Sequence, residues 1–326
     1  MPGNDFGALA NSTLIHDLMD DFRIDMGPLL GLAMNIGDKQ ANGTLVRGMK
    51  PGQTLTITDY FTPVAPYNQT AAGGYIAQDY AVGEPVTVTC PATVWARSTA
   101  LTAAEWRLLT GGPDAGAAYQ ELRAKLNLEM MYSMKKLMVE DFFAIITAAN
   151  YANNTVSGAG TFARSTEIDI ETELFTRNIK DRSNAKLILH PTAYGEWAKD
   201  HVAINTNTGG SQAQRVMGNG VQSQVTSMQV HRTNIALPAD AARGFAYTKT
   251  AALFINRIPD EPGLDGVATG AEMFNSLATV VDPVSGIAFL VRTWKNWKTG
   301  AIQIDVASIW KFAKLQGEAI ERVTAA

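Results

Sequence analysis

The chain has 326 residues, 46% of them hydrophobic, which is enough to bury a sizeable core in one large or two modest domains. The net charge of −4 excludes a general basic field for nucleic acid, and the single cysteine, Cys90, excludes an intrachain disulfide framework. No apolar run reaches the ~18 residues of a membrane span, and the first residues lack the pattern of a signal peptide. We therefore expect a protein that is made in a reducing cytoplasm. Its charged fraction of 18% is low, which predicts that partners cover much of its surface.

Residues 1–45 are predicted to form an arm rather than a domain. Leu14–Met34 contains a short amphipathic piece that is interrupted at Gly27-Pro28. Its few apolar residues cannot bury one another, so they need another surface.

From residue 45 to residue 100 the apolar residues recur with a period of two. Thr54–Thr58 and Val86–Cys90 alternate strictly, which predicts two half-exposed strands. The connection between them is far longer than most hairpin loops, and an isolated two-stranded ribbon is marginally stable in water. We expect the hairpin to lie across another surface, either its own domain or a neighbouring subunit. The contacts are assigned to its aromatic residues Tyr60, Phe61, Tyr67, Tyr75 and Tyr80.

Residues Tyr119–Asn150 are predicted to form one long helix of roughly 48 Å. Apolar residues recur there at spacings of three and four, which predicts a buried stripe of Tyr119, Leu122, Leu126, Met130, Met134, Leu137 and Met138. Charged residues gather on the opposite side, with Glu121 and Lys125, and Lys136 and Glu140, as pairs four residues apart. A helix this long suits an extended, plate-like subunit better than a compact enzyme. A shorter helix, Thr102–Leu109, is expected before it, with Thr102 as its cap.

The second half of the chain mixes helices and strands, so the expected fold class is α+β. After a linker at Thr155–Ser165, helices are expected at Ile168–Asp181 and Thr192–Lys199, and a polar loop at Asn205–Gln224. Strands are expected at Lys186–Leu189, Met228–Arg232, Ala251–Asn256, Ala278–Val281, Ile287–Thr293 and Ala301–Ala307. Phe312–Val323 is predicted to continue as a strand or a short helix.

No cluster of residues predicts catalysis, a metal site or a cofactor. The four histidines lack metal-ligand spacing, and no phosphate-binding loop or serine nucleophile motif is present. Cys90 resembles a small buried hydrophobe more than a reactive thiolate. Glu140 and Asp141 are adjacent on a helix and therefore point in different directions, so they do not form an acid–base pair.

One basic cluster interleaves cations with tryptophans: Arg292, Trp294, Lys295, Trp297 and Lys298. Such a pattern can bind single-stranded nucleic acid by stacking and phosphate contacts. The alternative, which the negative net charge favours, is a corner between two strands whose cations pair with a neighbouring subunit.

The order of these elements resembles the major capsid protein of tailed double-stranded DNA bacteriophages, the Hong Kong 97-type capsid fold. The local stretches that resemble the family are Val225–Pro238, Tyr247–Arg257, Leu290–Trp294 and Ala301–Glu318. The resemblance implies an N-terminal arm (1–45), an extended hairpin (46–101), a spine helix with a peripheral domain (102–165), an axial domain (166–270), and return strands that complete the peripheral domain (271–326).

The resemblance also implies a function: self-assembly through pentamers and hexamers into an icosahedral shell that encloses phage DNA, in a virion assembled in the host bacterial cytoplasm. The implied partners are other copies of the chain, scaffolding, portal and decoration proteins, and packaged DNA through weak contacts. No scaffolding segment precedes the arm, so a separate scaffolding protein, or none, is expected. Because residues 63–83 contain no lysine, we expect non-covalent locking of the shell. Two alternatives remain: an encapsulin-like nanocompartment shell and a cytoplasmic oligomeric binding protein or enzyme.

Overall fold

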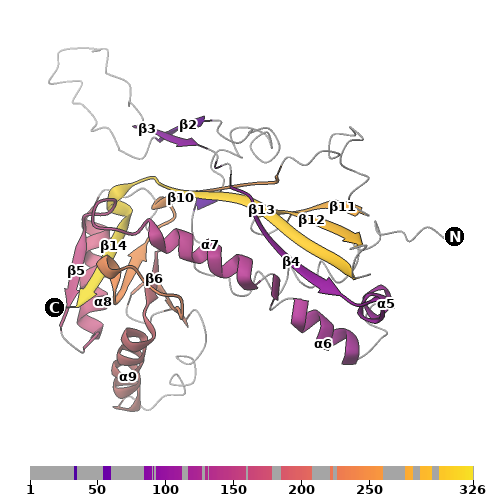
Figure 1. Cartoon of the computed structure of the whole chain (residues 1–326). Coiled ribbons are helices and arrows are strands. Elements are labelled where there is room, and N and C mark those ends of the chain that lie inside the picture. Colours follow the sequence, from indigo (N-terminus) through magenta and orange to yellow (C-terminus); the bar gives the residue numbers. More distant parts are fainter. Residues whose placement is uncertain are drawn as a thin grey trace, which may run out of the picture.

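The computed structural model describes the following parts of the chain: residues 33–34, 54–59, 84–89, 91, 93–111, 117–126, 129–130, 132–158, 161–177, 185–207, 221–222, 226–259, 276–281, 287–295 and 301–325. Helices and strands alternate irregularly along them, which confirms the predicted α+β class. The strands form two six-stranded sheets and one two-stranded ribbon (Figure 1). No helix in the described part is long and apolar enough to span a membrane.

The first sheet is organised around its longest strand, β13, which runs over Ile302–Lys314. One half of β13 pairs with both β4 and β12, and the other half pairs with β10, in each case antiparallel. The order is β1-β10-β13-β12-β11, and β4 is attached to β13 beside this path. The other strands are β1 (Ala33–Met34), β4 (Trp95–Leu101), β10 (Ala252–Arg257), β11 (Ser276–Val281) and β12 (Ala288–Lys295). Strand β1 therefore attaches the predicted N-terminal arm to the body of the subunit.

The second sheet has the order β5-β14-β9-β6-β8-β7. Its strands are β5 (Asn154–Ser157), β6 (Lys186–Leu189), β7 (Val221–Gln222), β8 (Gln229–Arg232), β9 (Gly244–Tyr247) and β14 (Ile320–Ala325). The C-terminal strand β14 lies between β5 and β9, pairing parallel with the first and antiparallel with the second. The predicted domain limits remain predictions, but strand pairing crosses the one at 270/271 in both directions: β10 pairs with β13 of the first sheet, and β14 pairs with β9 of the second.

The predicted continuous helix Tyr119–Asn150 is wrong. The chain forms α6 (Ala117–Leu126) and α7 (Tyr132–Ala144), with a π-helical turn at Glu129–Met130. Three side-chain contacts hold this break: Arg97 Nε and Ser133 Oγ donate to the Glu129 carbonyl at 3.2 and 3.1 Å, and Thr99 Oγ1 donates to the Glu129 carboxylate. Two of these contacts are made to a carbonyl of the π-helical turn, and the third holds the same residue through its side chain.

The predicted buried stripe survives the break. Leu137 is partly buried, and the side chain of Tyr119 lies outside the described part. The other five residues of the stripe are at most 5% exposed: Leu122, Leu126, Met130, Met134 and Met138. Lys136 pairs with Glu140 at 3.7 Å, whereas Lys125 pairs with Glu105 of the preceding helix at 3.2 Å. That helix, α5 (Ala103–Gly111), begins with the predicted cap, because Thr102 Oγ1 accepts from the Glu105 N–H and Glu105 accepts from the Thr102 N–H.

Helices α8 (Arg164–Thr176) and α9 (Pro191–Asn207) belong to the half that contains the second sheet. Two carboxylates one turn apart on α9 cap the start of α8: Glu196 accepts from the Phe162 N–H and Asp200 from the Arg164 N–H, both at 2.8 Å. The predicted linker Thr155–Ser165 is wrong, because its first residues form strand β5. The predicted loop after residue 204 begins later than expected, since α9 continues to Asn207, and residues 208–220 lie outside the described part.

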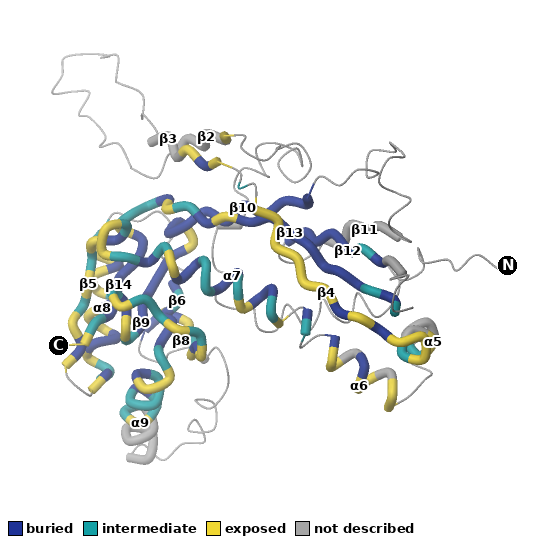
Figure 2. The backbone as a smooth tube through the Cα atoms, viewed as in Figure 1, coloured by how far each residue is buried: buried dark blue, intermediate teal, exposed yellow. Residues whose placement is uncertain are grey.

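The main core continues from one sheet to the other through helix α7 (Figure 2). Phe142 lies at its centre, with ring centroids 5.9 Å from Phe245, 5.7 Å from Tyr247 and 5.5 Å from Phe312. Phe245 and Tyr247 belong to the second sheet, and Phe312 belongs to the first. Helix α7 therefore packs against both sheets and joins the two halves.

Candidate assembly surfaces

Strands β2 (Thr54–Asp59) and β3 (Glu84–Thr89) form the predicted antiparallel ribbon. Thr54 lies opposite Thr89, with their hydroxyls 3.5 Å apart, and Leu55 lies opposite Val88. Val88 is buried, whereas its neighbours Thr87 and Thr89 are exposed, as alternation along a strand requires. The two-strand prediction is confirmed.

The base of the ribbon packs on the first sheet through Val88. This residue is 2% exposed and clusters with Leu253, Ile255 and Leu315 of the β10–β13 region. Phe254 and Phe312 of the same two strands stack on each other, with ring centroids 4.7 Å apart, and Phe312 contacts Phe142 of α7. Since neighbouring strand residues point to opposite faces, the ribbon and α7 lie on opposite sides of this sheet, as Figure 1 shows.

All five aromatic residues predicted to make hairpin contacts lie outside the described residues. Their proposed contact with a neighbouring subunit therefore stays a prediction. Asp59 pairs with Glu84, so the two ends of the 24-residue segment between the strands, residues 60–83, are held next to each other.

The basic cluster is only partly described. Arg292 forms an ion pair with Asp305, which also accepts a hydrogen bond from Ser98 at 3.1 Å. These three residues lie opposite one another on β12, β13 and β4, so the Arg292 guanidinium is bound within the subunit. The side chains of Trp294 and Lys295, and residues Trp297 and Lys298, lie outside the described part. Their predicted role in subunit contact is untested.

Strand β4 exposes an apolar surface that the sequence analysis did not single out. Val94 is 42% exposed and Trp95 is 39% exposed. Trp95 stacks on Trp310, with ring centroids 6.1 Å apart, and Trp310 Nε1 donates to Asp141 of α7 at 2.7 Å. Burial raises the pKa of the Asp141 carboxyl above its usual value. A tryptophan in a stretch of alternating residues was the available signal for this surface.

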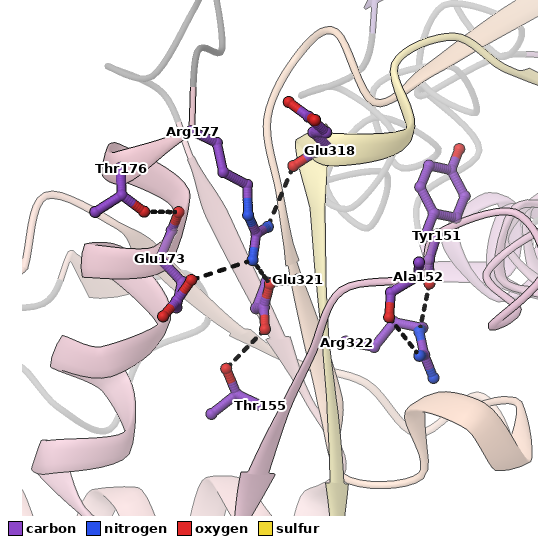
Figure 3. Close-up of polar contacts among 9 residues, drawn as sticks. All are labelled: Tyr151, Ala152, Thr155, Glu173, Thr176, Arg177, Glu318, Glu321 and Arg322. Atoms are coloured by element: carbon purple, nitrogen blue, oxygen red, sulfur yellow. Dashed lines mark hydrogen bonds and ion pairs between the residues drawn. The ribbon is translucent and has the colours of Figure 1, made fainter.

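The C-terminal strand is fixed to the second sheet by two arginines (Figure 3). Arg177, just after α8, forms an ion pair with Glu321 of β14, and Thr155 Oγ1 of β5 donates to the same carboxylate at 2.7 Å. Glu321 is 1% exposed, so this carboxylate is neutralised inside the protein.

The next residue along β14, Arg322, points to the other side of the sheet (Figure 3). It donates to the carbonyls of Tyr151 at 2.7 Å, Ala152 at 3.2 Å and Asp240 at 2.6 Å. Adjacent residues of one strand therefore anchor it on both faces.

The two adjacent carboxylates of α7 each have a structural partner. Glu140 pairs with Lys136, and Asp141 accepts from Trp310. The fully buried Glu167 accepts from Trp197 Nε1 at 2.7 Å and from Thr226. Within the described residues, no group of three or more His, Cys, Asp or Glu side chains is arranged to hold a metal ion. The prediction that this is not an enzyme remains untested.

Two of the four histidines have described side chains. The Thr192 N–H donates to His190 Nδ1 at 3.3 Å at the start of α9, which is a local turn contact. Burial, together with the charge of Lys186, lowers the pKa of His231 to about 4, so this imidazole is neutral at pH 7.

No family model matches this sequence, and no curated protein matches it. Three solved structures to which the chain is similar are shells. Bacteriophage PhiM1 mature capsid is 10% identical, covering 86% of this chain and 84% of the other, at a TM-score of 0.49. The capsid of Cyanophage P-SCSP1u is 10% identical, covering 85% and 84%, at 0.49. A virus-like particle from Pyrococcus furiosus is 10% identical, covering 98% and 99%, at 0.48. The function proposed below rests on the geometry of the chain itself.

Proposed function

We propose that this chain is the major capsid protein of a tailed double-stranded DNA bacteriophage. In this role it is a structural subunit that assembles through pentamers and hexamers into an icosahedral shell around the genome. The observation that carries the proposal is the ribbon β2–β3, which stands on one side of the first sheet while the spine helix α7 packs on the other. A two-stranded ribbon is marginal alone, and here its described packing within the subunit is at its base, through Val88.

The remaining contacts of the ribbon are assigned to a neighbouring copy. The 24 residues between its strands contain five aromatic residues and a single charged residue, Asp79. A segment of this composition gains free energy by covering another surface rather than by remaining in water.

The two halves of the body correspond to the two domains that the fold family implies. We assign the second sheet with α8 and α9 to the axial domain, which gathers around the symmetry axis of a capsomer. The first sheet with α5, α6 and α7 forms the peripheral domain. Heterologous contacts between such subunits close rings of five or six.

Many modest contacts then act together in the closed shell, so that each one can be weak while the assembly persists. Because residues 63–83 contain no lysine, locking through this segment is non-covalent.

The proposal is tested by expressing the chain alone and examining it by negative-stain electron microscopy, with light scattering on the same sample. Hollow particles of uniform size, or rings of five or six subunits, are the expected result. The contents of particles isolated from the native source distinguish a phage capsid from a nanocompartment. DNA inside them identifies a capsid, and a cargo protein in place of DNA identifies a nanocompartment. A uniform species of one to four subunits at high concentration contradicts both.

A further inference from the structure

The first half of strand β4 and the residues before it form an unusually open surface. Six consecutive residues, 93–98, are all exposed, and no other run of exposed residues in the described part of the chain is as long. Since neighbouring residues of a strand point to opposite faces, exposure of all six means that both faces are open here.

The strands that the structure describes also leave one edge of β4 without a partner. Its residues pair with β13 in an unbroken register from Trp95 opposite Ser308 to Leu101 opposite Ile302, without a bulge. Among the strands that the structure describes, β13 is its one partner. Proteins normally protect such an edge with lysine, proline, a bulge or a covering segment. Residues 93–98 contain neither lysine nor proline, and their one charge, Arg97, is held by the Glu129 carbonyl.

Two side chains at this edge, Trp95 and Arg97, are already held in position by contacts within the chain. Trp95 rests on Trp310, which Asp141 holds in place, and Arg97 is fixed through its Nε. Tryptophan and arginine are the residue types that most often dominate binding energy at interfaces. Because they are already ordered, binding costs little additional side-chain entropy.

We infer that the β4 edges of two copies of this chain pair antiparallel about a two-fold axis at Ala96. The inference rests on the proposed function, of which it names one subunit contact. The axis stands perpendicular to the sheet, so Ala96 faces its own copy, Trp95 faces Arg97 of the second copy, and Val94 faces Ser98.

Charge selects this register. The register centred on Ala96 places the Arg97 guanidinium of each copy against the electron-rich indole of Trp95 in the other copy. Each interface then has two cation–π contacts. A register centred on Arg97 opposes two like charges, which is destabilising. A register centred on Trp95 places Arg97 opposite Thr93 and forms no such contact. The resulting contact is isologous, and it links subunits across a two-fold axis rather than around a ring.

Disulfide trapping tests the contact. In a Cys90→Ser background, which removes the one native cysteine, Ala96→Cys places two thiols at the two-fold axis. Directly opposed residues of antiparallel strands have Cα atoms about 4.5–5.5 Å apart, within the range of a disulfide. We expect mild oxidation of the assembled protein to convert most chains into dimers on a non-reducing gel.

A mixture of two variants tests the register. Val94→Cys and Ser98→Cys are expected to cross-link with each other and not with themselves, since two copies of either residue lie about 13 Å apart along the strands. Cross-linking of Val94→Cys with Ala96→Cys instead would place the axis at Trp95 and overturn the proposed register. These positions are exposed, and circular dichroism of each variant confirms that it is folded before oxidation.

Electron microscopy of the same samples separates this inference from the proposed function. Particles whose Ala96→Cys chains stay monomeric on the gel overturn the β4 contact and leave the shell proposal standing. Dimers that cross-link fully but build no particles or rings support the contact and contradict the shell.

Discussion

The two halves of the molecule differ in how firmly other residues hold their strands. In the second sheet, the C-terminal strand is held on one face by Arg177 and Glu321 and on the other by Arg322. In the first sheet, six consecutive residues at and before the start of β4 are exposed, and the ribbon rests on the sheet through Val88. Polar side chains hold β14 on both of its faces, whereas the start of β4 has open faces and pairs with β13 alone among the described strands. We conclude that stability and assembly depend on different residues, so that substitutions can separate them.

The largest effect is expected in helix α7, which packs against both halves and to which we assign the role of the spine. Met134 is 3% exposed, so Met134→Asp places an unpaired charge in the core, and we expect a loss of at least about 4 kcal/mol and an unfolded chain. Circular dichroism and solubility measure this. The control is Lys136→Gln two residues away, which removes an exposed ion pair worth less than about 1 kcal/mol. A folded, soluble Met134→Asp variant would contradict the position of the spine.

A smaller loss is expected at the C-terminal strand. Glu321→Ala leaves the Arg177 guanidinium without its buried partner, and we expect about 2–4 kcal/mol less free energy of unfolding in urea. The matched control is Glu173→Gln, because Glu173 contacts the same arginine at 3.6 Å from a side chain that is 58% exposed. Its effect is expected to stay below about 0.5 kcal/mol. Equal effects from the two variants would refute the role of burial.

The second sheet is also expected to respond to acid through His231. Its pKa is about 4 in the folded protein, against an ordinary value of 6.5, so between these values the unfolded chain holds the proton. Stability is therefore retained above pH 6.5 and falls as the pH drops towards 4, by at most about 1.4 kcal/mol per pH unit from this group.

Urea unfolding of the native chain and of His231→Gln isolates this contribution from that of the carboxylates. The free energy of unfolding of the native chain, relative to that of His231→Gln, is expected to fall between pH 7 and pH 4. A difference that does not change with pH would show that His231 keeps an ordinary pKa in the fold.

The smallest effect on stability, and the largest on assembly, is expected in the ribbon. Deleting residues 63–83 leaves three residues between β2 and β3, which is a common hairpin length. The shorter loop lowers the entropic cost of loop closure by about 2 kcal/mol, which stabilises the ribbon. The subunit is therefore expected to stay folded while particles are lost. A glycine–serine segment of the same length controls for the geometry. Particles formed in normal yield by the deletion variant would contradict the role given to this segment.

The sequence predicted the elements that depend on local pattern. Thr54–Thr58 and Val86–Cys90 alternate, and the ribbon forms from Thr54–Asp59 and Glu84–Thr89. The stripe from Leu122 to Met138 is buried. The capping pair Thr102 and Glu105 begins α5.

Prediction failed where distant residues decide the structure. The π-helical turn between α6 and α7 contacts Arg97, which lies 32 residues from Glu129 in the chain. Strand β5 looked like a linker, because its partner β14 follows more than 160 residues later in the chain. The exposed edge of β4 was missed for the same reason, since exposure depends on which strands lie beside it.

The central claim is that this chain builds a closed shell, and electron microscopy of the protein expressed alone tests it most directly. We predict hollow particles of uniform size, or rings of five or six subunits, with a matching mass by light scattering. A monodisperse species of one to four subunits that persists at high concentration would contradict the claim and reopen the question of an enzymatic or binding function.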